Sequence, residues 1–168
     1  MIKKLLLLTL LLSGLATAQN LLPPKVKEVY TMDYTKDTLC LVRNFKVYKD
    51  PKWVAKIELK NGKSVFFSSP KSLIEFYHQP GKWFDVGVKS EKDFKNIIVT
   101  DYVTMELINA RDAFYIYGSR ATSPAGDDLV AIGDEQTAKE FAKKYGGKRI
   151  FKFKEIPEAL IRLINGRI

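Results

Sequence analysis

Few side chains in this sequence could act as nucleophiles or as soft metal ligands. Cys40 is the only cysteine among 168 residues, and His78 is the only histidine. A Ser-His-Asp triad would therefore have to use His78, and a haem attached through a Cys-x-x-Cys-His motif is excluded. Cys40 cannot form a disulfide within the chain. We expect its thiol to be buried, paired with a second chain or bound to a ligand.

A second candidate is the segment 121–132, ATSPAGDDLVAI, where a Ser-Pro pair, a glycine and two adjacent carboxylates interrupt a regular pattern. Its composition predicts a loop over residues 121–128 that presents side chains to a ligand. Asp127 and Asp128 could bind a hard cation such as Ca²⁺ or act as an acid–base pair. A Ca²⁺ site needs about six to eight oxygen ligands, and adjacent carboxylates on a loop are usually solvated. Both interpretations stay open at this level.

The first eighteen residues predict export. Two lysines precede an apolar run over residues 5–12, and residues 16–18 have the small-x-small pattern of a signal-peptidase site. We therefore expect a signal peptide over 1–18, cleavage after Ala18 and a periplasmic or secreted protein. An uncleaved anchor is the alternative, although the apolar run is shorter than the ~20 residues of a membrane span. Residues 19–39 are polar and contain prolines, which predicts an extended N-terminal arm.

The chain is basic. It has 28 lysine and arginine residues against 19 aspartate and glutamate residues, a formal net charge of +9. In an exported protein such a charge favours an anionic lipid surface or an acidic protein patch over nucleic acid. Solvation of the surface by lysines is the other interpretation.

The first half of the chain predicts the order strand, strand, helix, strand. Apolar and charged residues alternate over 53–60, which is the period of a half-buried strand with its lysines in solvent. Asn-Gly at 61–62 predicts a type I′ turn into a returning strand. Ser-Pro at 69–70 predicts the start of a helix, and the apolar stretch 96–103 predicts a buried strand.

The second half repeats this order between residues 111 and 156, and the two helices align at a constant offset, with Phe76 opposite Phe141. We therefore predict an α+β fold of two ββαβ units from an internal duplication. The first unit covers residues 40–105, and the second covers 106–168 and ends in a tail helix. The expected difference between the units is a two-residue turn in the first hairpin against a long loop in the second. We expect that loop to line a cleft.

Several stretches resemble the NosL-type copper chaperones, which serve nitrous-oxide reductase maturation. In the first half they are CLVRNFKVYKDPKWVAKI, the NG turn and FFSSPKSLIEFY; in the second half they are DYVTMELINARDAFYIYGSRATSPAGDDLVAI and GGKRIFKFKEI. The resemblance extends from Cys40 to Ile156. It implies an extracytoplasmic Cu(I)-binding protein built from two ββαβ units.

The chain departs from that family's usual metal motifs. The family commonly has Cys-x-x-Cys where this chain has Cys40-Leu-Val-Arg43, and Ser-Pro-Met-Gly where this chain has Ser-Pro-Ala125-Gly before Asp127. The resemblance thus leaves Cys40 as the single matching ligand. Cu(I) prefers thiolate, thioether and imidazole donors, and one thiolate cannot hold it tightly. Cys40 is therefore either a residual Cu(I) ligand or a small buried hydrophobe.

Other residues could complete a rearranged metal site. Met32 and Met105 offer thioethers, and His78 offers an imidazole; apolar packing of the methionines and a surface position for the histidine are the alternatives. We expect structural roles for the remaining candidates: Asp101, Arg111 and Asp112 as polar groups around the sheet, and Trp53 and the aromatic run 114–117 as packing residues.

Two functional hypotheses follow. The first is Cu(I) binding and delivery to nitrous-oxide reductase or another periplasmic copper protein. The second is a metal-free paralogue that binds a protein partner. We do not expect an enzyme, because no nucleophile–base pair can be assembled, nor do we expect nucleic-acid binding or a membrane span after signal cleavage.

Overall fold

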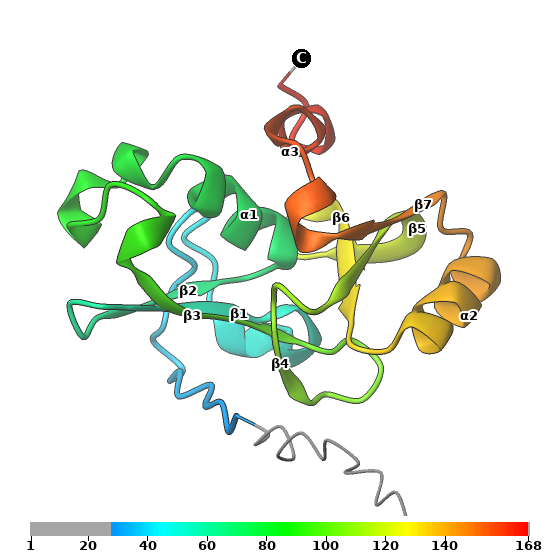
Figure 1. Cartoon of the computed structure of the whole chain (residues 1–168), viewed down its shortest axis with the longest axis horizontal. Coiled ribbons are helices and arrows are strands. Elements are labelled where there is room, and N and C mark those ends of the chain that lie inside the picture. Colours follow the sequence, from blue (N-terminus) through cyan, green and yellow to red (C-terminus); the bar gives the residue numbers. More distant parts are fainter. Residues whose placement is uncertain (1–27, 168) are drawn as a thin grey trace, which may run out of the picture.

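The protein forms two antiparallel sheets, each with its own helix, and ends in a third helix (Figure 1). The computed structural model describes residues 28–167. The predicted signal peptide and the first part of the predicted arm lie outside the described residues. Between residues 28 and 167 no helix is both long enough and apolar enough to cross a membrane. The predicted α+β class is confirmed.

The first sheet has the strand order β2-β1-β3-β4. Its strands are β1 (Ala55–Leu59), β2 (Ser64–Phe67), β3 (Phe94–Thr100) and β4 (Leu107–Asn109). Helix α1 (Pro70–His78) covers one face of this sheet through its buried apolar side chains. The ring of Phe76 lies 5.6 Å from that of Phe67. As predicted, Ser69 caps the helix, and its hydroxyl accepts the Ser72 backbone N–H at 3.3 Å.

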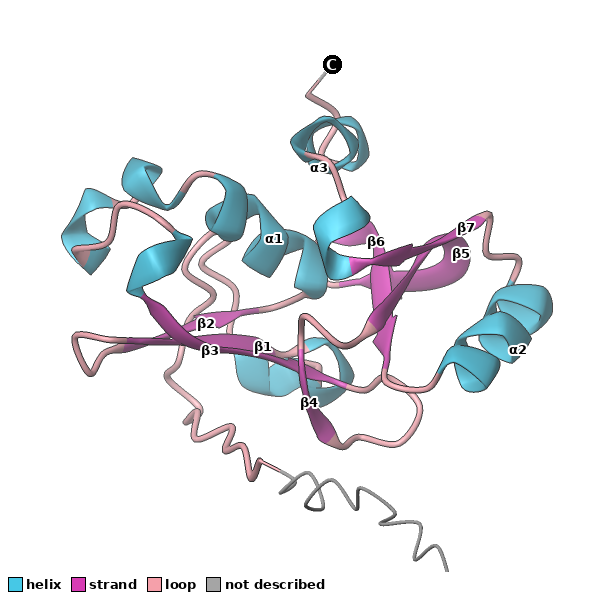
Figure 2. Ribbon diagram, in the orientation of Figure 1, coloured by secondary structure: helices cyan, strands magenta, loops and turns pink. Residues whose placement is uncertain are grey.

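The second sheet has the order β6-β5-β7 and packs against α2 (Figure 2). Asp134 caps α2 by accepting the Thr137 backbone N–H at 2.7 Å, and Gly146 ends it with a φ of +76°. The elements are β5 (Phe114–Ser123), β6 (Gly126–Ile132), α2 (Glu135–Tyr145), β7 (Arg149–Lys152) and the tail helix α3 (Glu158–Ile164). Short 3₁₀ helices are η1 (Val47–Lys49), η2 (Pro51–Trp53), η3 (Pro80–Lys82), η4 (Phe84–Val86), η5 (Glu91–Asp93) and η6 (Phe153–Glu155).

The expectation that the lysines of β1 face solvent is wrong for Lys56, whose exposed fraction is 1%. The described part of the N-terminal arm covers it. The Lys56 ammonium lies 2.8 Å from a carboxylate oxygen of Asp33 and 2.8 Å from one of Glu58. The Tyr34 ring contacts Phe66 edge to face at 6.4 Å. The arm thus buries the sheet face opposite α1, and β1 is covered on both sides.

Lowering the pH from 7 to 2 is expected to release the arm at Asp33. The hydrogen bond from Lys56 holds the pKa of Asp33 and of Glu58 below their ordinary values. A carboxylate with a lowered folded-state pKa stabilises the fold above its unfolded pKa, and this stabilisation is lost as the pH falls through the folded-state value. The contacts should therefore be complete at pH 7, begin to weaken below about pH 4, and be lost only as the pH falls through the lower folded-state pKa.

An NMR pH titration that follows the amide signals of Asp33 and Tyr34 measures this release. Lys56→Met should show the released signals already at pH 7, whereas Lys60→Met, on the exposed turn of the same hairpin, should behave as the native protein. Native arm signals that persist at pH 2 would contradict the prediction.

The second β-hairpin, like the first, has a short turn, so the predicted long loop over 121–128 is wrong. Ser123 pairs with Gly126 across the second hairpin, and most of the expected loop belongs to β5 and β6. Both turns end on a glycine with positive φ, +85° at Gly62 and +83° at Gly126. Asn61 does not share that conformation, so the first turn is not type I′ but a three-residue turn closed by a glycine.

Each sheet places the first strand of its unit between the second and third strands. An internal duplication predicts this shared order, and it stays a prediction that superposition of residues 52–102 on 111–155 would test. Strand β4 follows the predicted boundary after residue 105 yet pairs with β3 of the first sheet. Phe67 and Tyr115, one from each sheet, belong to the same buried cluster. The two units therefore share a hydrophobic core.

Candidate functional site

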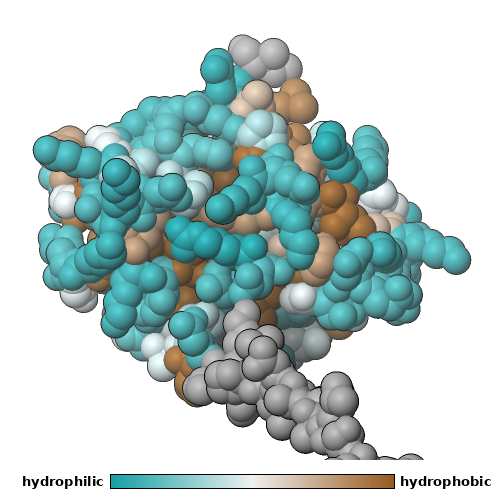
Figure 3. All heavy atoms as spheres, in the orientation of Figure 1, coloured by the Kyte–Doolittle hydropathy of each residue, from teal (hydrophilic) through white to brown (hydrophobic). Residues whose placement is uncertain are grey.

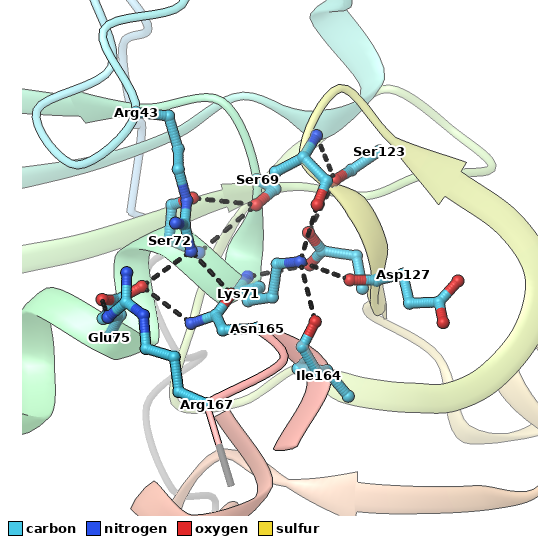
Figure 4. Close-up of polar contacts among 12 residues, drawn as sticks. Arg43, Ser69, Lys71, Ser72, Glu75, Ser123, Asp127, Ile164, Asn165 and Arg167 are labelled. Atoms are coloured by element: carbon cyan, nitrogen blue, oxygen red, sulfur yellow. Dashed lines mark hydrogen bonds and ion pairs between the residues drawn. The ribbon is translucent and has the colours of Figure 1, made fainter. Parts of the chain in front are cut away.

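Residues from four segments meet beside the first turn of α1 (Figure 4). The segments are the turn after Cys40, the start of α1, the β5–β6 turn and the end of α3. Two charged residues there are almost fully buried, Lys71 with an exposed fraction of 1% and Asp128 with 3%. Buried charges are costly unless they are paired and hydrogen-bonded. We call the following residues the polar cluster: Arg43, Ser69, Lys71, Glu75, Ser123, Asp128 and Asn165.

The Lys71 ammonium is held by backbone carbonyl groups. Its Nζ donates to the carbonyl oxygens of Ala125 at 2.9 Å and Asp127 at 2.6 Å, and to that of Ile164 at 3.5 Å. Burial lowers the pKa of Lys71; the charge of Asp128 opposes this shift and that of Arg43 adds to it. The lysine side chain thus ties α1 to both the β5–β6 turn and the C-terminal helix.

Asp128 accepts hydrogen bonds on both carboxylate oxygens. Its Oδ1 accepts the backbone N–H groups of Lys71 and Leu129, each at 2.8 Å, and its Oδ2 accepts the Ser123 hydroxyl at 2.7 Å. The bond to the Lys71 backbone places the carboxylate at the N-terminus of α1, where the helix dipole favours a negative charge. Burial nevertheless raises the pKa of Asp128. The carboxylate is a structural acceptor between the two units.

Glu75 forms ion pairs with two arginine side chains at the polar cluster. It lies 2.8 Å from the Arg43 guanidinium and 2.7 Å from that of Arg167, and it accepts the Asn165 side-chain amide at 2.9 Å. Arg43 also donates to the Asn165 side-chain oxygen at 2.6 Å. These bonds fasten the end of α3 onto α1 and the turn after Cys40. The Arg43 guanidinium is therefore committed to structural contacts.

The predicted soft ligands do not come together. Cys40 is fully buried and its thiol is free, while Met32 is partly buried against the same core cluster. Met105 lies in the loop between β3 and β4 and is 44% exposed. His78 ends α1, about 10 Å along the helix from Lys71, and its Nε2 contacts the Ile156 carbonyl oxygen at 3.1 Å. Within residues 28–167 no group of three or more His, Cys, Asp or Glu side chains could hold a metal ion.

The adjacent carboxylates separate. Asp128 faces the polar cluster, whereas Asp127 is exposed and its carboxylate points away from Lys71 (Figure 4). This arrangement leaves neither a shared Ca²⁺ site nor an acid–base pair, because successive residues of a strand point to opposite faces. The other polar candidates are structural: Asp101 accepts the backbone N–H groups of Val103, Thr104 and Gly133, Arg111 lies 3.8 Å from Glu91, and the Arg111–Asp112 segment turns after β4.

Sequence reasoning missed Lys71, the central residue of the polar cluster. A cation in the first turn of a helix opposes the helix dipole. A lysine directly after the Ser-Pro cap was therefore a signal that its charge is compensated elsewhere in the fold. The compensating groups come from residues more than 50 positions later in the chain, and no local pattern reveals them.

This fold is shared with a protein of known structure. The crystal structure of the copper chaperone NosL from Shewanella denitrificans superposes with a TM-score of 0.65 over 82% of this chain and 99% of that chain, at 24% sequence identity. The sequence profile of the NosL family matches residues 31–161. The chain belongs to the NosL family.

A curated relative has a shorter match. The copper-binding lipoprotein NosL of Stutzerimonas stutzeri is 38% identical over 56 residues, which are 33% of this chain and 29% of that protein. The chain therefore matches less than a third of that relative's length.

The residues at the expected metal positions do not fit Cu(I). Lys71 brings a positive charge to the β5–β6 turn, and the Arg43 charge acts on Lys71; like charges repel most strongly where water is excluded. Ala125 offers only a methyl group, and its carbonyl oxygen already accepts the Lys71 ammonium. The Lys71 ammonium thus occupies the interior side of this turn. A metal ion could enter only if the lysine left.

Proposed function

We propose that this chain is an exported, non-enzymatic accessory protein of copper-enzyme maturation that acts by binding a protein partner. Its own polar cluster is structural and holds no Cu(I). Membership of the NosL family and the leader-like residues 1–18 support the export and the accessory role. The partner is a copper-handling protein outside the cytoplasm, with nitrous-oxide reductase the candidate that the family suggests.

One observation carries the metal-free part of this proposal. The buried Lys71 ammonium donates to two carbonyl oxygens at the β5–β6 turn, where the family resemblance implies a thioether ligand, and to that of Ile164 at the end of α3. The Lys71 ammonium joins α1 to the β5–β6 turn and to the end of α3 without a metal ion. The cluster is therefore complete without copper.

Cu(I) binding and delivery is the second candidate function. It is favoured by Cys40, which keeps its motif position, and by the copper-related names of the relatives. Cys40 is fully buried, so this function would require the turn after it to open and a second soft donor to approach.

An anaerobic Cu(I) titration against a competing chelator distinguishes the two candidates. We expect no stoichiometric, chelator-resistant copper in the native protein, and the same result for Cys40→Ser, because a single thiolate is an insufficient soft donor set. Tight one-to-one binding that Cys40→Ser abolishes would overturn the metal-free proposal in favour of the second candidate.

A further inference from the structure

A groove lies between α2 and the β3–β4 loop, away from the polar cluster. Its volume is about 310 Å³. Three segments contribute to it: η2, the β3–β4 loop and one face of α2. Its lining consists of Lys52, Tyr102, Val103, Thr137, Glu140, Phe141, Lys144 and Tyr145. The groove therefore draws on both ββαβ units and depends on the complete fold.

Aromatic rings form a continuous row along this groove. Tyr102 contacts Trp53 with ring centres 5.0 Å apart and Phe141 at 5.6 Å, and Phe141 contacts Tyr145 at 4.4 Å. Trp53 and Phe141 are buried, while Tyr102 and Tyr145 are half-buried. The outer rings thus offer an apolar surface that the inner rings hold in place.

Two lysines flank the row of rings. The ammonium of Lys52 lies 5.2 Å from the centre of the Tyr102 ring, and that of Lys144 lies 5.2 Å from the centre of the Tyr145 ring. In the described part of the chain neither lysine forms an ion pair, unlike Lys56 and Lys139. Both ammonium groups are thus available to carboxylates from another molecule.

The loop that forms one wall is held rigidly while it exposes apolar side chains. The Asp101 carboxylate accepts three backbone N–H groups at 2.7 to 2.9 Å. Val103 is 49% exposed and Met105 44%, and Met105 has a φ of +64°, a conformation that is unfavourable for a side chain of this type. A fixed loop with exposed apolar side chains is a feature of recognition surfaces.

We propose that this groove binds an acidic segment of a protein partner. An apolar side chain of that segment rests on Tyr102 and Tyr145, and its carboxylates pair with Lys52 and Lys144. Charge complementarity identifies the partner, because the lining carries the two unpaired ammonium groups against the single carboxylate of Glu140, which accepts the Gln136 side-chain amide. A concave surface of this kind fits a protruding peptide better than a flat membrane. The inference rests on the proposed function in one respect, that the chain binds a protein.

Binding of a synthetic acidic peptide tests the groove. The probe is a capped peptide with one central Phe flanked on each side by two Glu residues, and its matched control has Gln in place of every Glu. We expect the acidic peptide to shift the NMR signals of Tyr102, Val103 and Lys144, and the Gln peptide to bind at least about tenfold more weakly. The double variant Lys52→Glu/Lys144→Glu should weaken binding of the acidic peptide by at least about tenfold at an unchanged melting temperature.

Lys60→Glu/Lys63→Glu is the matched control variant. It makes the same charge change on the exposed β1–β2 turn, at the opposite end of the molecule from α2 (Figure 1), and should keep native affinity within about twofold. Equal weakening by both double variants would overturn the proposal, since binding would then follow net charge alone. Signal shifts outside the groove would also overturn it, as would binding to vesicles of anionic phospholipid without binding to the peptide. These outcomes are independent of the copper titration. The proposal for the groove and the proposal of a metal-free cluster can therefore be refuted separately.

Discussion

Replacing Asp128 by alanine is expected to lower the free energy of unfolding by about 3–5 kcal/mol. The substitution leaves the backbone N–H groups of Lys71 and Leu129 without their acceptor and removes the shorter of the two acceptors of the Ser123 hydroxyl, which also donates to the Gly126 carbonyl oxygen. It also removes the negative charge that stabilises the buried, protonated Lys71 side chain. Urea unfolding followed by tryptophan fluorescence measures the change.

The neighbouring residue supplies the matched control. Asp127→Ala removes the same side chain from an exposed position and should change the free energy of unfolding by no more than about 0.5 kcal/mol. Asp128→Asn keeps the shape and one acceptor oxygen, and it should fall between the two alanine variants. Equal effects of the two alanine substitutions would show that Asp128 does not join the units in the way described.

A rebuilt soft site is expected to bind Cu(I) at least about a thousandfold more tightly than the native protein. The variant is Arg43→Cys/Lys71→Met/Ala125→Met, which adds three soft donors to the polar cluster and the β5–β6 turn and removes two positive charges. Each 1.4 kcal/mol of binding free energy corresponds to about a tenfold change in affinity, and one added soft ligand contributes more than that. The same chelator competition measures the dissociation constant.

Ala125→Met alone isolates the role of the lysine. It adds a thioether but keeps the Lys71 ammonium on the carbonyl oxygens of the turn, so it should gain little affinity. If this single variant bound Cu(I) as tightly as the triple variant, the conclusion that Lys71 blocks the site would be wrong. Lys71→Met/Ala125→Met is the fallback if loss of Arg43 prevents folding, because it leaves the Arg43–Glu75 ion pair intact.

Much of the fold could be predicted from local patterns. The Ser-Pro cap of α1 and the Asp134 cap of α2 are short-range signals, and both helices begin where these signals place them. The order strand, strand, helix, strand followed from the period of the apolar residues. The exposure of Lys56 could not be predicted, because the arm that buries it lies more than 20 residues earlier in the chain.

On the outer surface, too, composition predicted the general polarity, whereas the pairing of individual side chains depends on the fold. The excess of lysine and arginine predicted a polar exterior, and the face in Figure 3 is mostly hydrophilic with small separate hydrophobic areas. Composition does not distinguish an ion-paired lysine such as Lys139 from an unpaired one such as Lys144. That difference depends on which carboxylates the fold brings near.

The sequence by itself determined the inventory of the site: a single cysteine, a single histidine, an arginine at position 43 and an alanine at position 125. It did not determine that Asp127 and Asp128 lie on a strand and face opposite sides, because its pattern predicted a loop there. Only the tertiary structure decided that Asp128 is the buried member and that Lys71 is its partner, 57 residues away. The physical reason is that burial of a charge depends on donors and acceptors from distant segments, and only the packing of α1 against the β5–β6 turn brings those groups together.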